Sequence, residues 1–349
     1  MKVCQVLASD GNGGLEKHTI ELSRGLQAKG IDITVIAPKK YKDDFKNMNF
    51  IEMDLTKGRS NVFTLWKLFR ILKKEKFDII HAQANKATDM IIKLKPFLKS
   101  KIVATLHNFK KNLKPFLKAN AVITVSDRIG EKLNIDKKET IYNGIEIADN
   151  IDIDLHKHFN IPTDKFIICG VGRLVEAKGF DMLIESMQYM DHNIVLLLIG
   201  DGPDREKLEK LSKKLNIDNR ILFAGNIENK FTKSMMKSSD LLVISSRREG
   251  FSYVFAESLL LGTPIVSTDV ADIKKFIGPE YIIPFGDYNA LAKKLEDVKN
   301  NYAEVEQDFI PIFQKAVHEF TVENMVNQTI KVYANVMGFS MMNIEEEHN

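Results

Sequence analysis

The chain has 349 residues, of which 44% are hydrophobic, and 50 Lys and Arg stand against 47 Asp and Glu. This length exceeds an ordinary single domain and suits two, each able to bury a core. Only two cysteines occur, Cys4 and Cys169, and both lie in apolar stretches. A disulfide framework and a cysteine metal site are therefore excluded.

The net charge of +3 conceals an asymmetry between the two halves. Residues 1–150 hold 28 Lys and Arg against 17 Asp and Glu, and residues 151–349 hold 22 against 30. A basic first half indicates an anionic partner, either an acidic acceptor molecule or an anionic membrane face; no nucleic-acid motif accompanies it. The start has too short an apolar run for a signal peptide, and no segment approaches the roughly 20 apolar residues of a membrane span, so we expect a cytoplasmic protein.

The first half alternates short apolar runs with segments of helical period, such as Glu16–Gln27 and Val62–Lys74. This alternation predicts parallel strands buried on both faces of a sheet. The predicted strands are Val3–Ala8, Ile31–Ala37, Ile79–Ala82, Ile102–Leu106, Ala121–Val125 and Thr140–Tyr142.

The loop Ser9–Gly14 follows the first predicted strand and precedes the first helix. Its glycines let backbone amides approach a phosphate or a sugar at a helix N-terminus. Because the loop is not a full G-x-G-x-x-G, a plain flexible turn is the alternative.

Three segments interleave basic and apolar residues: Phe63–Phe77, Ile92–Lys101 and Phe109–Lys118. The first predicts a helix packed on the core through an apolar stripe, and interfacial attachment to anionic lipid is the second interpretation. The stripe includes Phe63, Trp66, Phe69 and Leu72. The cationic residues of the three segments are Lys67, Arg70, Lys73, Lys74, Lys93, Lys95, Lys99, Lys110, Lys111, Lys114 and Lys118.

His107, beside Asn108, ends the strand VATLH, where an imidazole can hydrogen-bond a substrate hydroxyl or be purely structural. Asn143-Gly144 is a turn dipeptide at the last strand end of the first half.

The second half repeats the alternation after a polar linker at Asp149–Thr163, and Thr321–Met337 predicts a terminal helix. We therefore predict a first domain over residues 1–150, a second over 151–320 and a final helix over 321–338. The predicted strands of the second domain are Phe166–Val171, Ile194–Ile199, Ile221–Ala224, Leu241–Ile244, Ile265–Ser267 and Tyr281–Ile283.

Two motifs follow strands of the second half. In the first, Gly170–Gly179, Arg173 and Lys178 follow the strand's carboxyl end, with a helix expected near Lys178; together these cations can hold a diphosphate. In the second, Arg248–Glu257, Glu249 lies in a loop and a helix is expected from near Gly250, with Glu257 about two turns in. Carboxylates there can accept hydrogen bonds from sugar and ribose hydroxyls. Surface cations and a solvated helix face are the plain alternatives.

The chain resembles the large retaining glycosyltransferase family of GT-B fold, often called family 4 or group 1, over most of its length and most strongly from Phe166 to Ser267. The segments GVGRLVEAKGFDMLIES, LLLIGDGPDREKLE, ILFAGNI and SSRREGFSYVFAESLLLGTPIVST stand in that family's order and spacing. The resemblance implies two Rossmann-like α/β domains with parallel sheets facing a central cleft, and a C-terminal helix that returns to the first domain.

The resemblance also implies roles. Arg173 and Lys178 would hold the donor diphosphate, Glu257 the ribose, and Glu249 and His107 the donor sugar, while backbone amides near Phe251 and Ser252 would meet donor groups. The predicted catalytic residues are Glu249, His107, Arg173 and Lys178. The predicted substrate-binding residues are Gly13, Gly14, Gly172, Asn143, Phe251, Ser252 and Glu257. The family often carries a Gly-Gly-x-x-Glu-like segment after the strand Ile265–Ser267, where this chain has Asp269–Ile273 without glycine.

We therefore expect a sugar to move from a nucleotide-diphospho-sugar to a glycan or lipid-linked acceptor with retention, in cell-envelope polysaccharide assembly. No metal and no cofactor are expected, because the two cations replace the metal. A catalytically weak nucleotide-sugar-binding protein on an anionic membrane remains an alternative. A nicotinamide dehydrogenase is disfavoured, because the second strand ends at Ala37-Pro38-Lys39, without the acidic residue that a dinucleotide needs.

Overall fold

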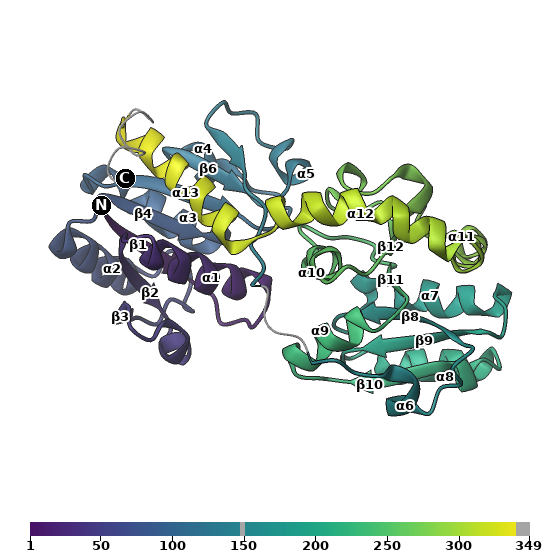
Figure 1. Ribbon diagram of the computed structural model, residues 1–349. Coiled ribbons are helices and arrows are strands. Elements are labelled where there is room, and N and C mark those ends of the chain that lie inside the picture. Colours follow the sequence, from purple (N-terminus) through teal and green to yellow (C-terminus); the bar gives the residue numbers. More distant parts are fainter. Residues whose placement is uncertain (147–150, 340–349) are drawn as a thin grey trace. The chain divides into compact units, whose positions relative to one another are not determined.

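The computed structural model describes residues 1–146 and 151–339, which form two compact units (Figure 1). Unit 1 comprises Met1–Glu146 and Glu319–Asn349, and unit 2 comprises Ile147–His318. The predicted linker begins at Asp149 and Asn150, which lie outside the described residues. Its remainder carries a short helix, α6 (Leu155–Phe159), capped by the Asp154 side chain.

Unit 1 contains a seven-stranded sheet in the order β3-β2-β1-β4-β5-β6-β7, with every neighbouring pair parallel. The sequence missed β3 because it is an edge strand whose residues are only half-buried or exposed, so it lacks a continuous apolar run. The last strand, β7 (Lys138–Thr140), begins two residues before the predicted strand Thr140–Tyr142. The strands are β1 (Lys2–Leu7), β2 (Asp32–Ala37), β3 (Asn49–Glu52), β4 (Ile79–Gln83), β5 (Lys101–Leu106), β6 (Ala121–Thr124) and β7 (Lys138–Thr140).

The C-terminal helix α13 (Val322–Met337) packs beside α1 (Gly14–Ala28) and belongs to the core of unit 1 (Figure 1). A Cβ atom on Gly25 of α1 would lie 2.4 Å from Cγ2 of Val326, so only glycine permits this approach. The remaining helices of the unit are α2 (Val62–Glu75), α3 (Ala84–Leu94), α4 (Lys114–Leu117) and α5 (Asp127–Gly130).

Unit 2 contains a six-stranded parallel sheet in the order β10-β9-β8-β11-β12-β13. The strands are β8 (Phe166–Val171), β9 (Ile194–Ile199), β10 (Ile221–Gly225), β11 (Leu241–Ile244), β12 (Ile265–Thr268) and β13 (Ile282–Ile283). The helices are α7 (Phe180–Ser186), α8 (Arg205–Lys214), α9 (Asn229–Lys237), α10 (Tyr253–Leu261), α11 (Tyr288–Asn300) and α12 (Tyr302–Glu319).

Both sheets reverse their strand order beside their first strand. The reversal lies between β1 and β4 in unit 1 and between β8 and β11 in unit 2. Open α/β sheets bind ligands beyond the carboxyl ends of the strands at this switch point. The predicted fold of two Rossmann-like α/β units with parallel sheets is confirmed, and each switch point is an expected ligand-binding position.

Candidate active site

The switch point of unit 2 holds an ion pair between Lys178 and Glu249. Lys178 Nζ lies 2.5 Å from Glu249 Oε1, and the two side chains are 24% and 12% exposed. Ser246 Oγ, at the end of β11, donates to the same carboxylate oxygen at 2.9 Å. No partner for Glu249 Oε2 lies among the described residues, so this oxygen can accept a hydrogen bond from a ligand hydroxyl.

Glycine backbone brings these two loops together. Gly179 has a φ of +65°, and a Cβ there would lie 2.0 Å from the carbonyl oxygen of Ser245. Ser245 Oγ also donates to the Lys178 carbonyl at 3.1 Å. The loop after β8 is thereby held against the end of β11, which places Lys178 beside Glu249. The expected helix near Lys178 is a 3-10 turn over Glu176–Lys178, and α7 follows it.

Arg173 lies beside a cavity of about 540 Å³ at the carboxyl ends of β8, β9 and β10. Its side chain is exposed, and no salt bridge or hydrogen bond holds it among the described residues. Gly172, the preceding residue, lies under the Lys178 side chain: a Cβ on it would lie 3.2 Å from Lys178 Cε. Gly172, Arg173, Lys178 and Glu249 therefore gather at one end of the sheet, as predicted from the sequence.

Arg247 braces this loop and was not predicted from the sequence. Its guanidinium forms a two-pronged ion pair with Asp181, at 2.9 Å and 2.6 Å, and donates to the Glu176 carbonyl at 2.6 Å. Burial raises the pKa of Asp181, but the hydrogen bonds and the charge of the guanidinium, with backbone hydrogen bonds, together outweigh it and hold this pKa below its ordinary value. The two consecutive arginines in SSRREG could have suggested a role for Arg247, but its partner Asp181 lies 66 residues earlier in the sequence.

The second motif continues into α10, which begins at Tyr253 rather than near Gly250 as expected. Ser252 caps the helix, because its side chain accepts a hydrogen bond from the Phe255 amide at 3.3 Å. Phe251 precedes the cap and packs edge-on against Tyr253. Glu257 is therefore just over one turn into the helix instead of two, and it is 7% exposed.

The segment Asp269–Ile273 lacks the glycines expected from the resemblance, and one of its residues has a backbone conformation that favours glycine. Ala271 has a φ of +46°, in the left-handed region that costs a non-glycine residue about 1–3 kcal/mol. Asp272 is buried at 4% exposure. The turn after β12 thus holds a non-glycine residue in a left-handed conformation at an energetic cost.

In unit 1, the loop after β1 is closed by the chain's own carboxylate. Gly13 donates its amide to Glu16 Oε2 at 2.7 Å, and Ser9 Oγ donates to Glu16 Oε1 at 2.5 Å. Gly13 and Gly14 are exposed at the start of α1. With Glu16 at the helix N-terminus, a phosphate there would meet an anion, so this loop suits neutral hydroxyl groups better than phosphate.

His107 lies just beyond β5 at 6% exposure. Its Nε2 lies 2.9 Å from Gln83 Oε1, and its ring meets His18 edge-on at 4.7 Å between centroids. Burial lowers the pKa of His107 well below its ordinary value, so the ring is neutral. Burial likewise lowers the pKa of His18 to about 4 and of His81 to about 3.

Asn143 is buried at 2% exposure, and its Oδ1 has no hydrogen-bond partner among the described residues. The following Gly144 packs against the start of α13, where a Cβ would lie 2.5 Å from Val322 Cα. The dipeptide is thus a tightly packed connection to the C-terminal helix rather than a surface turn.

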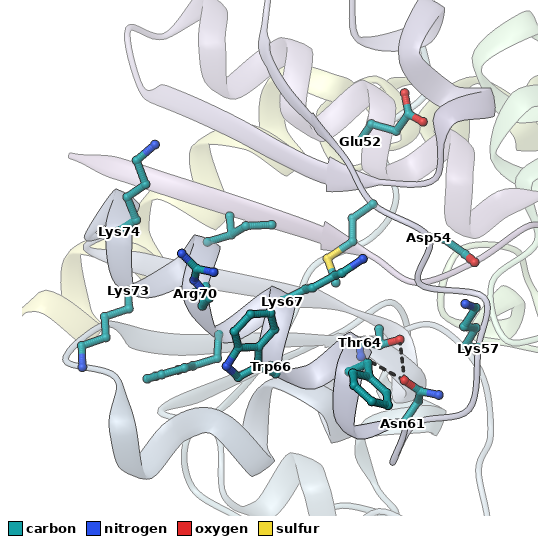
Figure 2. A pocket seen from close by; sticks show the side chains of 14 residues that line it. Glu52, Asp54, Lys57, Asn61, Thr64, Trp66, Lys67, Arg70, Lys73 and Lys74 are labelled. Carbon is teal, nitrogen blue, oxygen red and sulfur yellow. Dashed lines mark hydrogen bonds between the residues drawn. The ribbon is translucent and has the colours of Figure 1, made fainter.

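The α2 helix exposes aromatic and basic side chains beside a cavity of about 990 Å³ (Figure 2). Phe63 and Trp66 are 78% and 52% exposed. The prediction that these two pack on the core is wrong. The buried face is formed by Thr64, Leu68 and Leu72, which follow one another at four-residue spacing.

Cations lie over the aromatic rings of this helix. The Arg70 guanidinium lies 5.0 Å from the Trp66 ring centroid, and Lys73 Nζ lies 5.3 Å from that of Phe69. Phe97, 69% exposed, packs edge-on against Phe69. We call the exposed side chains of this region the α2 patch: Phe63, Trp66, Lys67, Arg70, Lys73, Lys74 and Phe97.

Within residues 1–146 and 151–339, no three His, Cys, Asp or Glu side chains are placed to hold a metal ion. Over the same ranges, no helix combines the length and the apolar character needed to cross a bilayer. Cys4 and Cys169 are free and buried, as the sequence predicted.

Comparison with known proteins identifies both units. The family described as Glycosyltransferase Family 4 matches residues 12–149, and the family described as Glycosyl transferases group 1 matches residues 152–315. The uncharacterized glycosyltransferase MJ1607 of Methanocaldococcus jannaschii is 26% identical over 92% of this chain and 94% of its own. LpsE of Rhizobium meliloti, a lipopolysaccharide core biosynthesis glycosyltransferase, is 27% identical over 85% of each chain.

The fold is shared with solved structures. Alr3699/HepE of Anabaena, solved in complex with UDP, has a TM-score of 0.82 at 16% identity, covering 96% of this chain and all of that one. A further structure of the same protein contains UDP-glucose. With both units matched by glycosyltransferase families and 96% of the chain sharing this fold, the protein belongs to the GT-B glycosyltransferases.

Proposed function

We propose that the chain transfers a hexosyl group from a nucleoside-diphosphate sugar to a glycan or lipid-linked acceptor, with retention of anomeric configuration, in cell-envelope polysaccharide assembly. The observation that carries the proposal is the Lys178–Glu249 pair at the switch point of unit 2, beside the cavity that Arg173 lines. It joins a fixed cation, a carboxylate and a free guanidinium at the end of the sheet where such folds bind nucleotides.

The cations suit a diphosphate leaving group. Lys178 has three N–H donors and uses one on Glu249, so two can point at phosphate oxygens. Arg173 adds a planar fork that fits phosphate. Negative charge grows on the diphosphate as the anomeric bond breaks, and fixed cations stabilise that state without a metal ion. Retention follows from the family likeness and is part of the proposal.

The remaining candidates have the following proposed roles. Glu249 Oε2 accepts a hydroxyl of the donor sugar, and Glu257 accepts the ribose hydroxyls. The start of α10, at Phe251 and Ser252, supplies backbone amides to donor groups. In unit 1, His107 meets a hydroxyl of the donor sugar, and the exposed glycines of the first loop, with Asn143, contribute to acceptor recognition.

The relatives narrow the proposal for donor and acceptor. UDP and UDP-glucose in HepE support a uridine-based hexose donor, and the role of LpsE in lipopolysaccharide core biosynthesis supports an envelope acceptor. The decisive assay is a panel of nucleoside-diphosphate sugars read by release of the diphosphate, with and without envelope glycan acceptors and with excess chelator.

Acceptor-dependent release from a UDP-hexose, unchanged by chelator, is the expected result. Loss of all activity in chelator would refute the metal-free part. Tight donor binding with no release under any condition would favour the alternative, a catalytically weak nucleotide-sugar-binding protein.

We further propose that the chain works as a cytoplasmic protein attached peripherally to an anionic membrane through the α2 patch. Exposed Phe63 and Trp66 offer apolar insertion, and the neighbouring cations offer attraction to anionic lipid at about 1 kcal/mol each. Reversing Lys67 and Arg70 to Glu should weaken partition into phosphatidylglycerol vesicles by about 2 kcal/mol or more, roughly 30-fold.

The matched control is charge reversal at Lys42 and Lys46, which are exposed in unit 1 on the 3-10 segment Lys39–Phe45 or just after it. These reversals should leave vesicle binding almost unchanged if the α2 patch is the contact. Equal losses in both variants would show only a general charge effect, and no binding by the natural chain would refute the membrane proposal.

A further inference from the structure

A continuous chain of buried hydrogen bonds links the C-terminal helix to His107. Tyr333 Oη lies 2.7 Å from His81 Nδ1 and 3.2 Å from Gln5 Nε2. Gln5 Oε1 accepts from Gln83 Nε2 at 2.8 Å, and Gln83 Oε1 lies 2.9 Å from His107 Nε2. These side chains come from β1, β4, the end of β5 and α13, and none is more than 6% exposed.

With the two amides oriented as in the structure, each histidine ring carries its proton on a defined nitrogen. Gln83 Oε1 can only accept, so His107 Nε2 carries the hydrogen and its Nδ1 keeps a lone pair. The Gln83 amide cannot rotate by 180° alone, because its Oε1 would then replace Nε2 beside Gln5 Oε1 and two acceptors would face each other. Rotating both amides by 180° would exchange donor and acceptor at every hydrogen bond between them and the two rings. In either orientation, the tautomer of His81 therefore determines the tautomer of His107.

The far end of the chain agrees with this assignment. His81 Nδ1 is approached by the Tyr333 hydroxyl and, at 3.4 Å, by Gln5 Nε2, so it is an acceptor. Its Nε2–H therefore donates to Thr105 Oγ1 at 2.6 Å. The roles proposed above for sugar transfer assign no contact with substrate to His81 or Tyr333, so those roles alone do not explain this buried polar chain.

The backbone changes direction directly after Gln83. Ala84 has a φ of +63°, a left-handed conformation that costs a non-glycine residue about 1–3 kcal/mol and persists only where its surroundings impose it. Gln83 itself is the last residue of β4 and keeps an extended backbone, and α3 begins at Ala84 directly after it.

We propose that Tyr333 positions His107 through Gln5 and Gln83, so that His107 presents Nδ1 as an acceptor and selects a sugar that offers a hydroxyl there. A carboxylate at the same point, as in a uronic acid, would set two acceptors against each other. No hydrogen-bond partner for Nδ1 occurs among the residues that the structure describes. The proposal rests on the proposed function only for the identity of the ligand; the linkage itself is a property of the ligand-free chain.

The test is ¹⁵N NMR of the histidine rings in the full chain without substrate. In the natural protein, His107 should show the Nε2–H tautomer. Tyr333→Phe removes the hydroxyl but keeps the ring, and it should convert His107 into a mixture of tautomers. Tyr302→Phe is the matched control, because Tyr302 also donates its hydroxyl inside the protein, to the Asp240 carbonyl at 2.8 Å, but in unit 2.

Activity provides a second readout. Tyr333→Phe should lower the preference for a neutral hexose donor over the matching uronate by about three- to tenfold, the worth of one hydrogen bond. If this variant does not fold, Gln83→Met keeps the side-chain length and breaks the same link. An Nδ1–H tautomer in the natural chain, or a His107 tautomer that stays single in a folded Tyr333→Phe or Gln83→Met variant, overturns the proposal. A chain with the expected tautomers and no transferase activity would instead refute the proposed function.

Discussion

Replacing Lys178 by Met removes the cation from the switch point of unit 2 while keeping its apolar stem. The loss of one phosphate contact in the transition state costs about 2–4 kcal/mol, which corresponds to about a 30- to 1,000-fold fall in kcat. Stability should change less. Breaking a surface ion pair lowers the free energy of unfolding by about 0–1 kcal/mol, and breaking a buried one lowers it by about 3–5 kcal/mol. The Lys178–Glu249 pair is partly buried, so we expect a loss of about 1–2 kcal/mol. For a unit of this size, Tm then falls by about 2–8 °C.

Two further variants separate charge from packing. Glu249→Gln added to Lys178→Met removes the unpaired carboxylate, so it should restore part of the Tm but none of the activity. Lys210→Met is the matched control, because its Nζ also lies 2.5 Å from a carboxylate, that of Glu206, but both side chains are more than 70% exposed. It should leave kcat unchanged. A Lys178→Met enzyme with near-natural kcat, measured by diphosphate release, would refute the reasoning.

Gly179→Ala should unfold or inactivate unit 2, because its Cβ would lie 2.0 Å from the Ser245 carbonyl oxygen. Gly262→Ala, at a similar φ but with nothing within 4 Å of its Cβ, should lower the free energy of unfolding by only about 1 kcal/mol. Equal Tm values for the two variants would contradict this. The buried, neutral histidines should make unit 1 lose stability as the pH falls. Burial lowers the pKa of His18 to about 4 and of His81 to about 3 in the folded chain, while the unfolded chain takes up protons near pH 6.5. Between pH 6.5 and about 4, each of the two should cost about 1.4 kcal/mol per pH unit, and His18→Gln should flatten the slope. Urea unfolding followed by tryptophan fluorescence tests this, because the only tryptophan lies in unit 1; a pH-independent midpoint would be the contrary result.

The sequence predicted most of the fold because continuous apolar runs identify strands buried on both faces. The bounds of β8, β9 and β11 are those expected. The edge strand β3 was missed because an edge strand need not be apolar throughout. In α2, the predicted apolar stripe is right at Leu72 and wrong at Phe63 and Trp66, because these two are as apolar as Leu68 and only the packing distinguishes them.

The candidate site divides in the same way. Lys178 and Glu249 could be chosen because each follows a strand of the same sheet, and carboxyl ends of parallel strands share an edge. The bracing pair of Arg247 and Asp181 could not be chosen, since nothing local links two residues 66 positions apart. The hydrogen bonds of Tyr333 could not be predicted from the sequence either, because they depend on how α13 packs against the sheet of unit 1.

The central claim is that Arg173 and Lys178 receive the diphosphate of a sugar nucleotide, and a crystal structure of the chain with bound UDP tests it most directly. We predict the diphosphate oxygens within hydrogen-bonding distance of both cations and the ribose hydroxyls at Glu257. A diphosphate bound elsewhere on unit 2, or at neither cation, would contradict the account.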